Sequence, residues 1–81
     1  MRKFEAVRQA QDCVTTLTEG KKGVWMVRFR KDIGSPWEIY QGFNRLEVML
    51  FRRDKLIRHA RRLLGKPEDY DNSRKEWALN I

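Results

Sequence analysis

The strongest hydrophobic pattern in the chain lies between Asn44 and Gly65. Asn44 suits a helix N-cap, with Glu47 three residues later, and Gly65 followed by Pro67 is typical of a helix end. At 100° per residue, a stripe about 100° wide collects six apolar side chains: Leu46, Met49, Leu50, Ile57, Ala60 and Leu64. We therefore predict an amphipathic helix over residues 44–65 that turns this stripe toward the core.

Two upstream segments alternate as half-buried strands do. Residues 24–30 and 37–43 place large apolar side chains at alternating positions, and residues 33–36, with Gly34 and Pro36, supply a turn between them. We predict an antiparallel hairpin under the helix. The side chains expected to face the helix are Trp25, Val27, Phe29, Trp37, Ile39 and Phe43.

The N-terminal part of the chain carries a weaker pattern. The spacing of its apolar residues predicts a helix over about residues 3–11. Residues 12–18 are rich in β-branched side chains and form either a third strand or an extension of that helix; both alternatives stay open. The predicted fold is α+β: a short N-terminal helix, a two- or three-stranded antiparallel sheet and a long basic helix, in one domain over residues 1–65.

Residues 66–81 form a separate, mildly acidic tail, with three basic and four acidic side chains. Ser73 and Glu76 have the spacing of a capping box, which predicts a short docking helix that carries Trp77. We expect Trp77 to bind a partner protein.

The charge of the chain is strongly positive and unevenly distributed. Lys and Arg number 18 against 11 Asp and Glu, for a net charge of +7. The segment 44–65 alone holds seven basic and two acidic residues. Such an excess indicates a polyanion or an acidic protein as partner.

On the helical face opposite the apolar stripe, cations accompany two apolar side chains, Val48 and Phe51. A face that is merely solvated rarely carries two such side chains together, so we expect both to bind a partner protein. Six of the seven basic residues in this segment are Arg, which is favoured for bidentate phosphate and carboxylate contacts. The cations expected to reach phosphates or partner carboxylates are Arg52, Lys55, Arg58, Arg61 and Arg62.

The outer face of the hairpin is a second candidate surface. If the large apolar side chains pack under the helix, Arg28, Arg30, Tyr40 and Met26 share the opposite face. A basic, aromatic sheet face can enter a DNA groove or stack on bases. The alternation of a sheet with one wet face would produce polar residues here in any case.

Several classes of protein find no support in the sequence. One cysteine, Cys13, and one histidine, His59, cannot complete a zinc site or an internal disulfide. Phosphate-loop, dinucleotide-binding and metal-binding motifs are absent, and no apolar run approaches the roughly 20 residues of a membrane-spanning helix. The N-terminus lacks the apolar run of a signal peptide. We expect a cytoplasmic protein with no cofactor, no metal, no membrane and no small-molecule substrate.

The order of elements resembles a known family. The segment Trp25-Met26-Val27-Arg28-Phe29, leading through Phe43 to the helix over 44–65, is similar to the three-stranded sheet plus helix of phage integrase arm-binding domains. In size, basicity and single-domain build, the chain also resembles small accessory regulators of temperate phages of the Lxc (Bof) corepressor type. Those regulators tighten the binding of a repressor to its operators by binding the repressor–DNA complex.

Three hypotheses follow for function. The leading one, which the second resemblance implies, is a non-enzymatic, corepressor-like transcription regulator that binds a DNA-bound, repressor-type protein and contacts DNA phosphates. The alternative is direct binding of double-stranded DNA by the sheet face, with Arg28, Arg30 and Tyr40 as readers. A small basic ribonuclease toxin is the third, and its best evidence would be the convergence of Tyr40 and Arg28.

Overall fold

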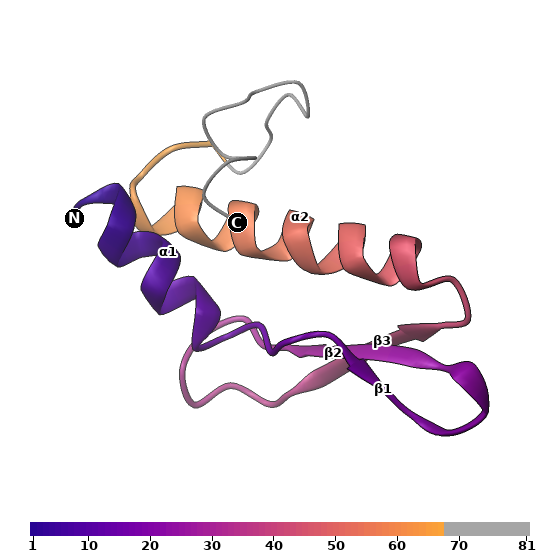
Figure 1. Ribbon diagram of the computed structural model, residues 1–81. Coiled ribbons are helices and arrows are strands. Elements are labelled where there is room, and N and C mark those ends of the chain that lie inside the picture. Colours follow the sequence, from indigo (N-terminus) through magenta and orange to yellow (C-terminus); the bar gives the residue numbers. More distant parts are fainter. Residues whose placement is uncertain (68–81) are drawn as a thin grey trace.

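The computed structural model describes residues 1–67 and has an α+β fold (Figure 1). In chain order its elements are α1 (Lys3–Gln11), β1 (Thr18–Glu19), the 3-10 turn η1 (Lys21–Gly23), β2 (Trp25–Phe29), β3 (Glu38–Gly42) and α2 (Arg45–Leu63). The strands form one antiparallel sheet in the order β1-β2-β3. The predicted fold class is confirmed, whereas the predicted tail helix and Trp77 lie outside the described residues.

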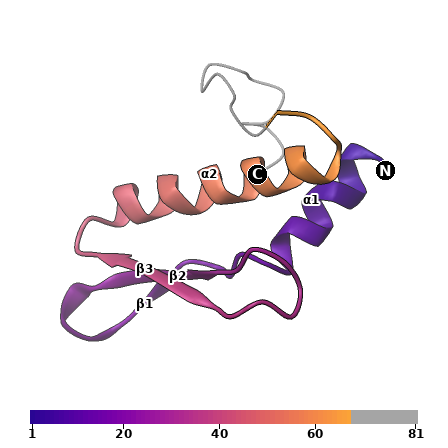
Figure 2. The same cartoon turned by 180° about the vertical axis from the view of Figure 1, so that it is seen from behind.

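The described elements are arranged in two layers. Figures 1 and 2 show α2 running along one face of the sheet, with α1 crossing near the C-terminal end of α2. The core lies where these elements meet. Its buried side chains are Ala6 and Ala10 of α1, Val14, Val27 of β2, and Val48, Leu56, Ile57 and Ala60 of α2.

Residues 12–18, left open between helix and strand, run alongside β2 in an extended path. Val14 bridges to Phe29, and the amide N of Thr15 donates to the carbonyl O of Arg28 at 2.8 Å. The third strand is therefore present, although its regular part is only Thr18–Glu19. The β-branched side chains of this segment have restricted χ1 rotamers, which favour an extended path. The preceding helix, α1, ends at Gln11 as predicted.

Both ends of α2 follow the predicted signals. The Asn44 side-chain oxygen accepts a hydrogen bond from the amide N of Glu47 at 3.2 Å, which satisfies one of the free donors of the first turn. At the other end Gly65 has φ +74°, a left-handed conformation, and the amide N of Lys66 donates to the carbonyl O of Arg61 at 2.9 Å. This is the hydrogen-bond pattern of a Schellman C-cap.

The prediction for the inward face of β3 is wrong. Val27 pairs with Tyr40 in the register, and the Tyr40 ring stacks on Phe51 of α2, with centroids 3.9 Å apart and planes 6° apart. Tyr40 therefore faces the helix, and its neighbour Ile39 faces outward with 55% of its surface exposed. The alternation was ambiguous because this strand carries large apolar or aromatic side chains on both faces. Trp37 and Phe43, also predicted to face the helix, are likewise exposed.

The predicted orientation of the N-terminal half of α2 is also wrong. Val48 is 1% exposed, and Phe51 packs edge-on against Phe29, with centroids 5.3 Å apart. The stripe residues that were predicted to be inside are exposed instead: Leu46, Met49 and Leu50. Apolar residues surround this half of the helix, so the aromatic side chains of the sheet select the face. In the C-terminal half, the stripe residues Ile57 and Ala60 are buried as predicted.

Two leucines on α2 provide a matched test of this orientation. Leu56 is 1% exposed and Leu50 is 47% exposed. We expect Leu56→Ala to lower the free energy of unfolding by about 2–5 kcal/mol because it leaves a cavity. Leu50→Ala should change it by no more than about 0.5 kcal/mol, as surface substitutions usually do. Urea denaturation of both variants measures the difference, and equal losses would show that α2 packs by its predicted stripe.

Candidate nucleic-acid interface

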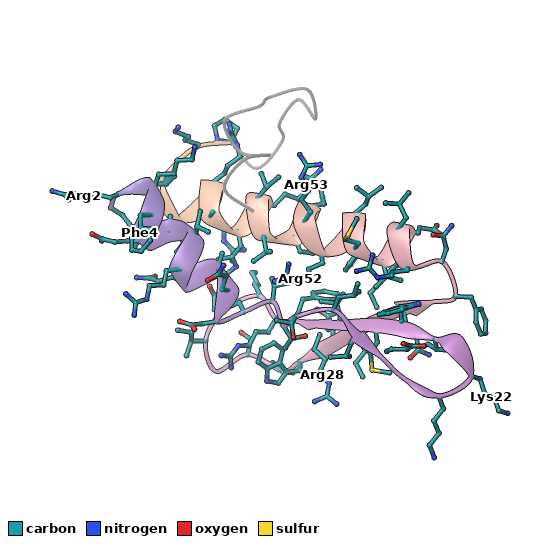
Figure 3. The ribbon with its side chains drawn as sticks, in the orientation of Figure 1. Arg2, Phe4, Lys22, Arg28, Arg52 and Arg53 are labelled. Carbon is teal, nitrogen blue, oxygen red and sulfur yellow. The ribbon has the colours of Figure 1, made fainter. Side chains whose placement is uncertain are left out.

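The sheet face that points away from α2 carries an exposed polar and apolar surface. In the register, Met26 lies opposite Gln41 and Arg28 lies opposite Ile39. Because residues two apart on a strand share a face, these four side chains form one cross-strand cluster, which we call the outer sheet face. Arg28, Ile39 and Gln41 are exposed, and Figure 3 shows Arg28 extending away from α2.

Backbone contacts hold the strand at Arg28. Its amide N donates to the Thr15 hydroxyl oxygen at 2.9 Å, and its carbonyl O accepts from the amide N of Thr15 at 2.8 Å. With Ile39 paired on the other side, Arg28 lies on the central strand of the sheet. The base of this exposed cation is therefore fixed, while its guanidinium lies in solvent.

Arg30, a predicted reader, lies just beyond the end of β2 in a more constrained setting. Its guanidinium carbon lies 4.2 Å from the centre of the Trp37 ring, a cation–π contact, and its Nη2 donates to the carbonyl O of Asp12 at 2.9 Å. Trp37 remains 44% exposed. Arg30 and Trp37 thus form a rigid pair beside the outer sheet face.

Tyr40, the third predicted reader, does not share this face with Arg28. It pairs with Val27 and stacks on α2, so the two side chains point to opposite sides of the sheet. Sequence reasoning missed Ile39 and Gln41 instead. The available signal was the parity of β3, because once Tyr40 is inward its neighbours on the strand must point outward.

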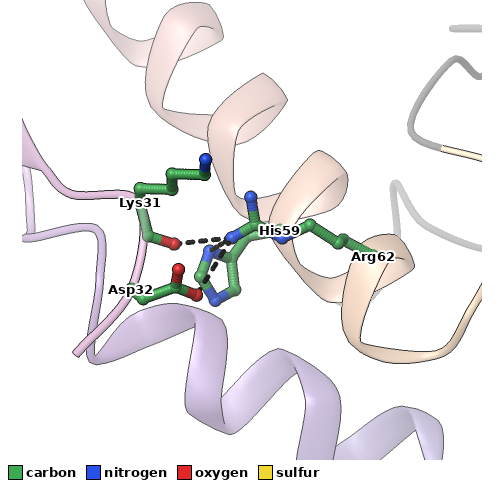
Figure 4. Close-up of polar contacts among 4 residues, drawn as sticks. All are labelled: Lys31, Asp32, His59 and Arg62. Carbon is green, nitrogen blue, oxygen red and sulfur yellow. Dashed lines mark hydrogen bonds and ion pairs between the residues drawn. The ribbon is translucent and has the colours of Figure 1, made fainter. Parts of the chain in front are cut away.

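Three of the predicted helix cations bind the chain itself. The Arg52 Nε donates to the carbonyl O of Thr15 at 2.8 Å, and burial lowers the pKa of this guanidinium, which stays charged. The Arg61 Nε donates to the carbonyl O of Pro67 at 2.7 Å. Arg62 Nη2 donates to the carbonyl O of Lys31 and lies 3.1 Å from His59 Nδ1 (Figure 4). These contacts tie α2 to three other segments.

The remaining two predicted helix cations lie on the sheet side of α2. The Lys55 Nζ lies over the ring of Phe29, 4.7 Å from its centre, and 5.4 Å from the centre of the Phe51 ring. The Arg58 Nε binds an Asp54 carboxylate oxygen at 2.8 Å, one turn earlier on the helix. Both side chains line a cavity beside the strand ends.

The predicted partner-binding set is reduced by the structure. Val48 is buried and Phe51 is half-buried under the aromatic side chains of the sheet, so neither forms an exposed anchor. The exposed apolar side chains of α2 are Leu46, Met49 and Leu50. Trp77 lies outside the described residues.

Within residues 1–67, no group of three or more His, Cys, Asp or Glu side chains is placed to hold a metal ion. Over the same range, neither α1 nor α2 is long and apolar enough to cross a membrane. Comparisons with protein-family models, curated proteins and solved structures found no match for this chain.

The role of Arg52 can be tested against its neighbour. Arg52→Ala removes the donor to the Thr15 carbonyl, and we expect it to lower the free energy of unfolding by about 1–3 kcal/mol. Arg53 extends away from the sheet (Figure 3), so Arg53→Ala should change that free energy by no more than about 0.5 kcal/mol. Chemical denaturation of both variants gives the comparison. If Arg52→Ala left stability unchanged but weakened DNA binding, Arg52 would be a phosphate ligand, as the sequence suggested.

Proposed function

We propose that the protein is a non-enzymatic, cytoplasmic protein that binds double-stranded DNA through its outer sheet face. The observation that carries this proposal is the exposed cross-strand cluster of Arg28, Ile39 and Gln41, held on the side of the sheet opposite α2. Arg pairs with guanine edges, Gln with adenine edges, and aliphatic groups contact the thymine methyl. The cluster therefore offers one side chain for each of these contacts.

The dimensions of the sheet support the proposal. The DNA major groove, roughly 12 Å wide, admits a two-stranded ribbon. Neighbouring strands lie about 4.8 Å apart, so β2 and β3 fit within that width. β1 adds two residues to one edge, and Val14 and Thr15 extend that edge beside Phe29 and Arg28. Three strands with this spacing span about 10 Å between their outer backbones, which is still within the groove width. Because α2 covers the other face, the sheet would enter the groove as a braced element.

Phosphate contacts would come from the ends of the sheet. Lys21 and Lys22 are exposed in the turn between β1 and β2, and Figure 3 shows Lys22 extending from its tip. At such a position a lysine can reach a phosphate while the strands lie in the groove. Contacts of this kind make affinity fall steeply with salt and carry no sequence preference.

A second candidate is the corepressor-like regulator, now with a different partner surface. Leu46, Met49 and Leu50 are exposed on α2, with Arg53 among them on the side away from the sheet. A DNA-bound, repressor-type protein with an apolar and acidic surface would fit there while the outer sheet face remains on DNA. A photo-crosslinker at position 50 tests this: the adduct must require DNA and must be lost in Leu46→Glu.

The ribonuclease hypothesis gains no support from the geometry. Its best evidence would be the convergence of Tyr40 and Arg28, and these side chains lie on opposite faces of the sheet.

The DNA-binding proposal is tested on a duplex selected from a random-sequence pool. We expect Arg28→Ala and Gln41→Ala each to weaken binding to the selected duplex by about 1–3 kcal/mol and to relax the preference at one base position. Lys22→Ala should weaken binding to all duplexes and lower the slope of log affinity against log salt by about one. Fluorescence anisotropy at several salt concentrations measures all three variants.

Tyr40→Phe is the control, because it keeps the stacked ring and changes only the helix side of the sheet. It should bind the selected duplex as the parent does. The proposal fails if Arg28→Ala and Gln41→Ala bind selected and random duplexes with unchanged affinity.

A further inference from the structure

A cationic cavity of about 330 Å³ lies between α2 and the end of the sheet, on the helix side. Phe29 and Glu38, which pair across β2 and β3, both line it, as does Lys55 from α2. The basic side chains around it are Arg30, Lys31, Lys55, Arg58 and Arg62. Glu38 is the one carboxylate among its described lining residues.

Two of the cations around this cavity have carboxylate partners among the described residues. Asp54 binds Arg58 at 2.8 Å, and Asp32 lies 3.5 Å from Arg62. Lys55 has aromatic rings beneath its ammonium group rather than a described carboxylate. Several like charges around a partly enclosed space concentrate the field and attract anions.

A buried donor in the same wall lacks an acceptor. The Arg30 Nε is buried without a hydrogen-bond partner, while its Nη2 is bound to the Asp12 carbonyl. An unsatisfied buried donor is costly, so this part of the cavity wall holds a polar group that the described chain leaves without an acceptor. Figure 4 shows another part of the wall, where Arg62 contacts the carbonyl O of Lys31, the Nδ1 of His59 and the carboxylate of Asp32. That wall is built before any ligand arrives.

We propose that this cavity binds a phosphorylated ligand of nucleotide size. Lys55 and Arg58 would hold the phosphoryl group, since ionised donors make the strongest hydrogen bonds to phosphate oxygens. Arg30 and Lys31 add positive charge to the same cavity. The volume exceeds the need of a bare phosphate and lies within the range of small-molecule pockets. Phe29 and Val14 supply an apolar wall for the rest of the molecule. From the sequence we expected no small-molecule substrate, so a free nucleotide in this cavity would run against that expectation.

The same chemistry has two sources: a free mononucleotide, or the 5′-terminal nucleotide of a nucleic-acid strand. The inference does not depend on DNA binding by the outer sheet face, because that face and the cavity lie on opposite sides of β2 and β3. Failure of one proposal therefore leaves the other standing.

Isothermal titration calorimetry at about 50 mM salt, where screening is weak, provides the test. The probes are adenosine 5′-monophosphate, adenosine, inorganic phosphate, and a short single strand with and without a 5′-phosphate. We expect saturable one-to-one binding of the monophosphate or of the 5′-phosphorylated strand, and none of adenosine or of the unphosphorylated strand. The monophosphate alone assigns the site to free nucleotides, and the phosphorylated strand alone assigns it to strand ends.

Three single-residue variants of the full chain test which side chains determine the affinity for the ligand. Lys55→Gln should weaken binding about tenfold by removing one charge-assisted contact. Glu38→Gln should tighten it severalfold, because it removes the carboxylate that repels the ligand, and Glu38 is exposed, so folding is not at risk. Arg8→Gln, which removes an exposed arginine of α1 outside the cavity, should leave affinity unchanged.

General loss of structure would weaken binding in both variants, so it cannot explain tighter binding by Glu38→Gln together with weaker binding by Lys55→Gln. The proposal is overturned if adenosine binds as well as its monophosphate. It is also overturned if Arg8→Gln weakens binding as much as Lys55→Gln does, or if Glu38→Gln leaves the affinity unchanged.

Discussion

The stack of Tyr40 on Phe51 fixes how helix and sheet face each other. Its nearly parallel rings, with Phe29 edge-on to Phe51, join β2, β3 and α2 in one aromatic cluster. Once Tyr40 is inward, Ile39 and Gln41 must be outward. With Phe51 inward, Leu50 lies about 100° around the helix from it and is 47% exposed. The content of the outer sheet face and the exposed part of α2 both depend on this contact.

The elements themselves could be predicted from the sequence because their signals are local. Asn44 and Gly65 mark the ends of α2 through hydrogen bonds and φ values that only nearby residues determine. The facing of those elements is not local. On β3, Trp37 and Ile39 compete with Tyr40 for the inward side, and only pairing with β2 and packing under Phe51 decides between them. The same difference applies to the candidate site. Arg28 could be identified because the alternation on β2 is clear, whereas Gln41 was missed because the alternation on β3 is ambiguous.

Several basic side chains stabilise the fold through hydrogen bonds within the chain and are therefore less available to a ligand. Arg52 and Arg62 donate to carbonyls of distant segments, which a short chain with a small core can use as cross-links. Arg61 donates to the carbonyl of Pro67, six residues further along the chain. The guanidinium group suits this purpose, since it provides several donors on a long stem whose methylene groups pack well. Net charge alone therefore overstates the positive surface available to a polyanion. Within residues 1–67, the cations best placed for ligands lie on the outer sheet face, at the β1–β2 turn and around the cavity.

The apolar residues exposed on the N-terminal half of α2 offer a second way for this helix to pack on the sheet. Leu46, Met49 and Leu50 would make an acceptable inner face if the helix rolled about its axis, so the chain encodes a competing arrangement with the same secondary structure. The aromatic cluster and the arginine cross-links must favour the native arrangement over this competitor. Each difference of about 1.4 kcal/mol in free energy between the two arrangements changes the ratio of their populations tenfold. Weakening Tyr40 or Phe51 would thus do more than lower stability. It would reduce the discrimination between two helix orientations and, with it, the uniqueness of the folded state.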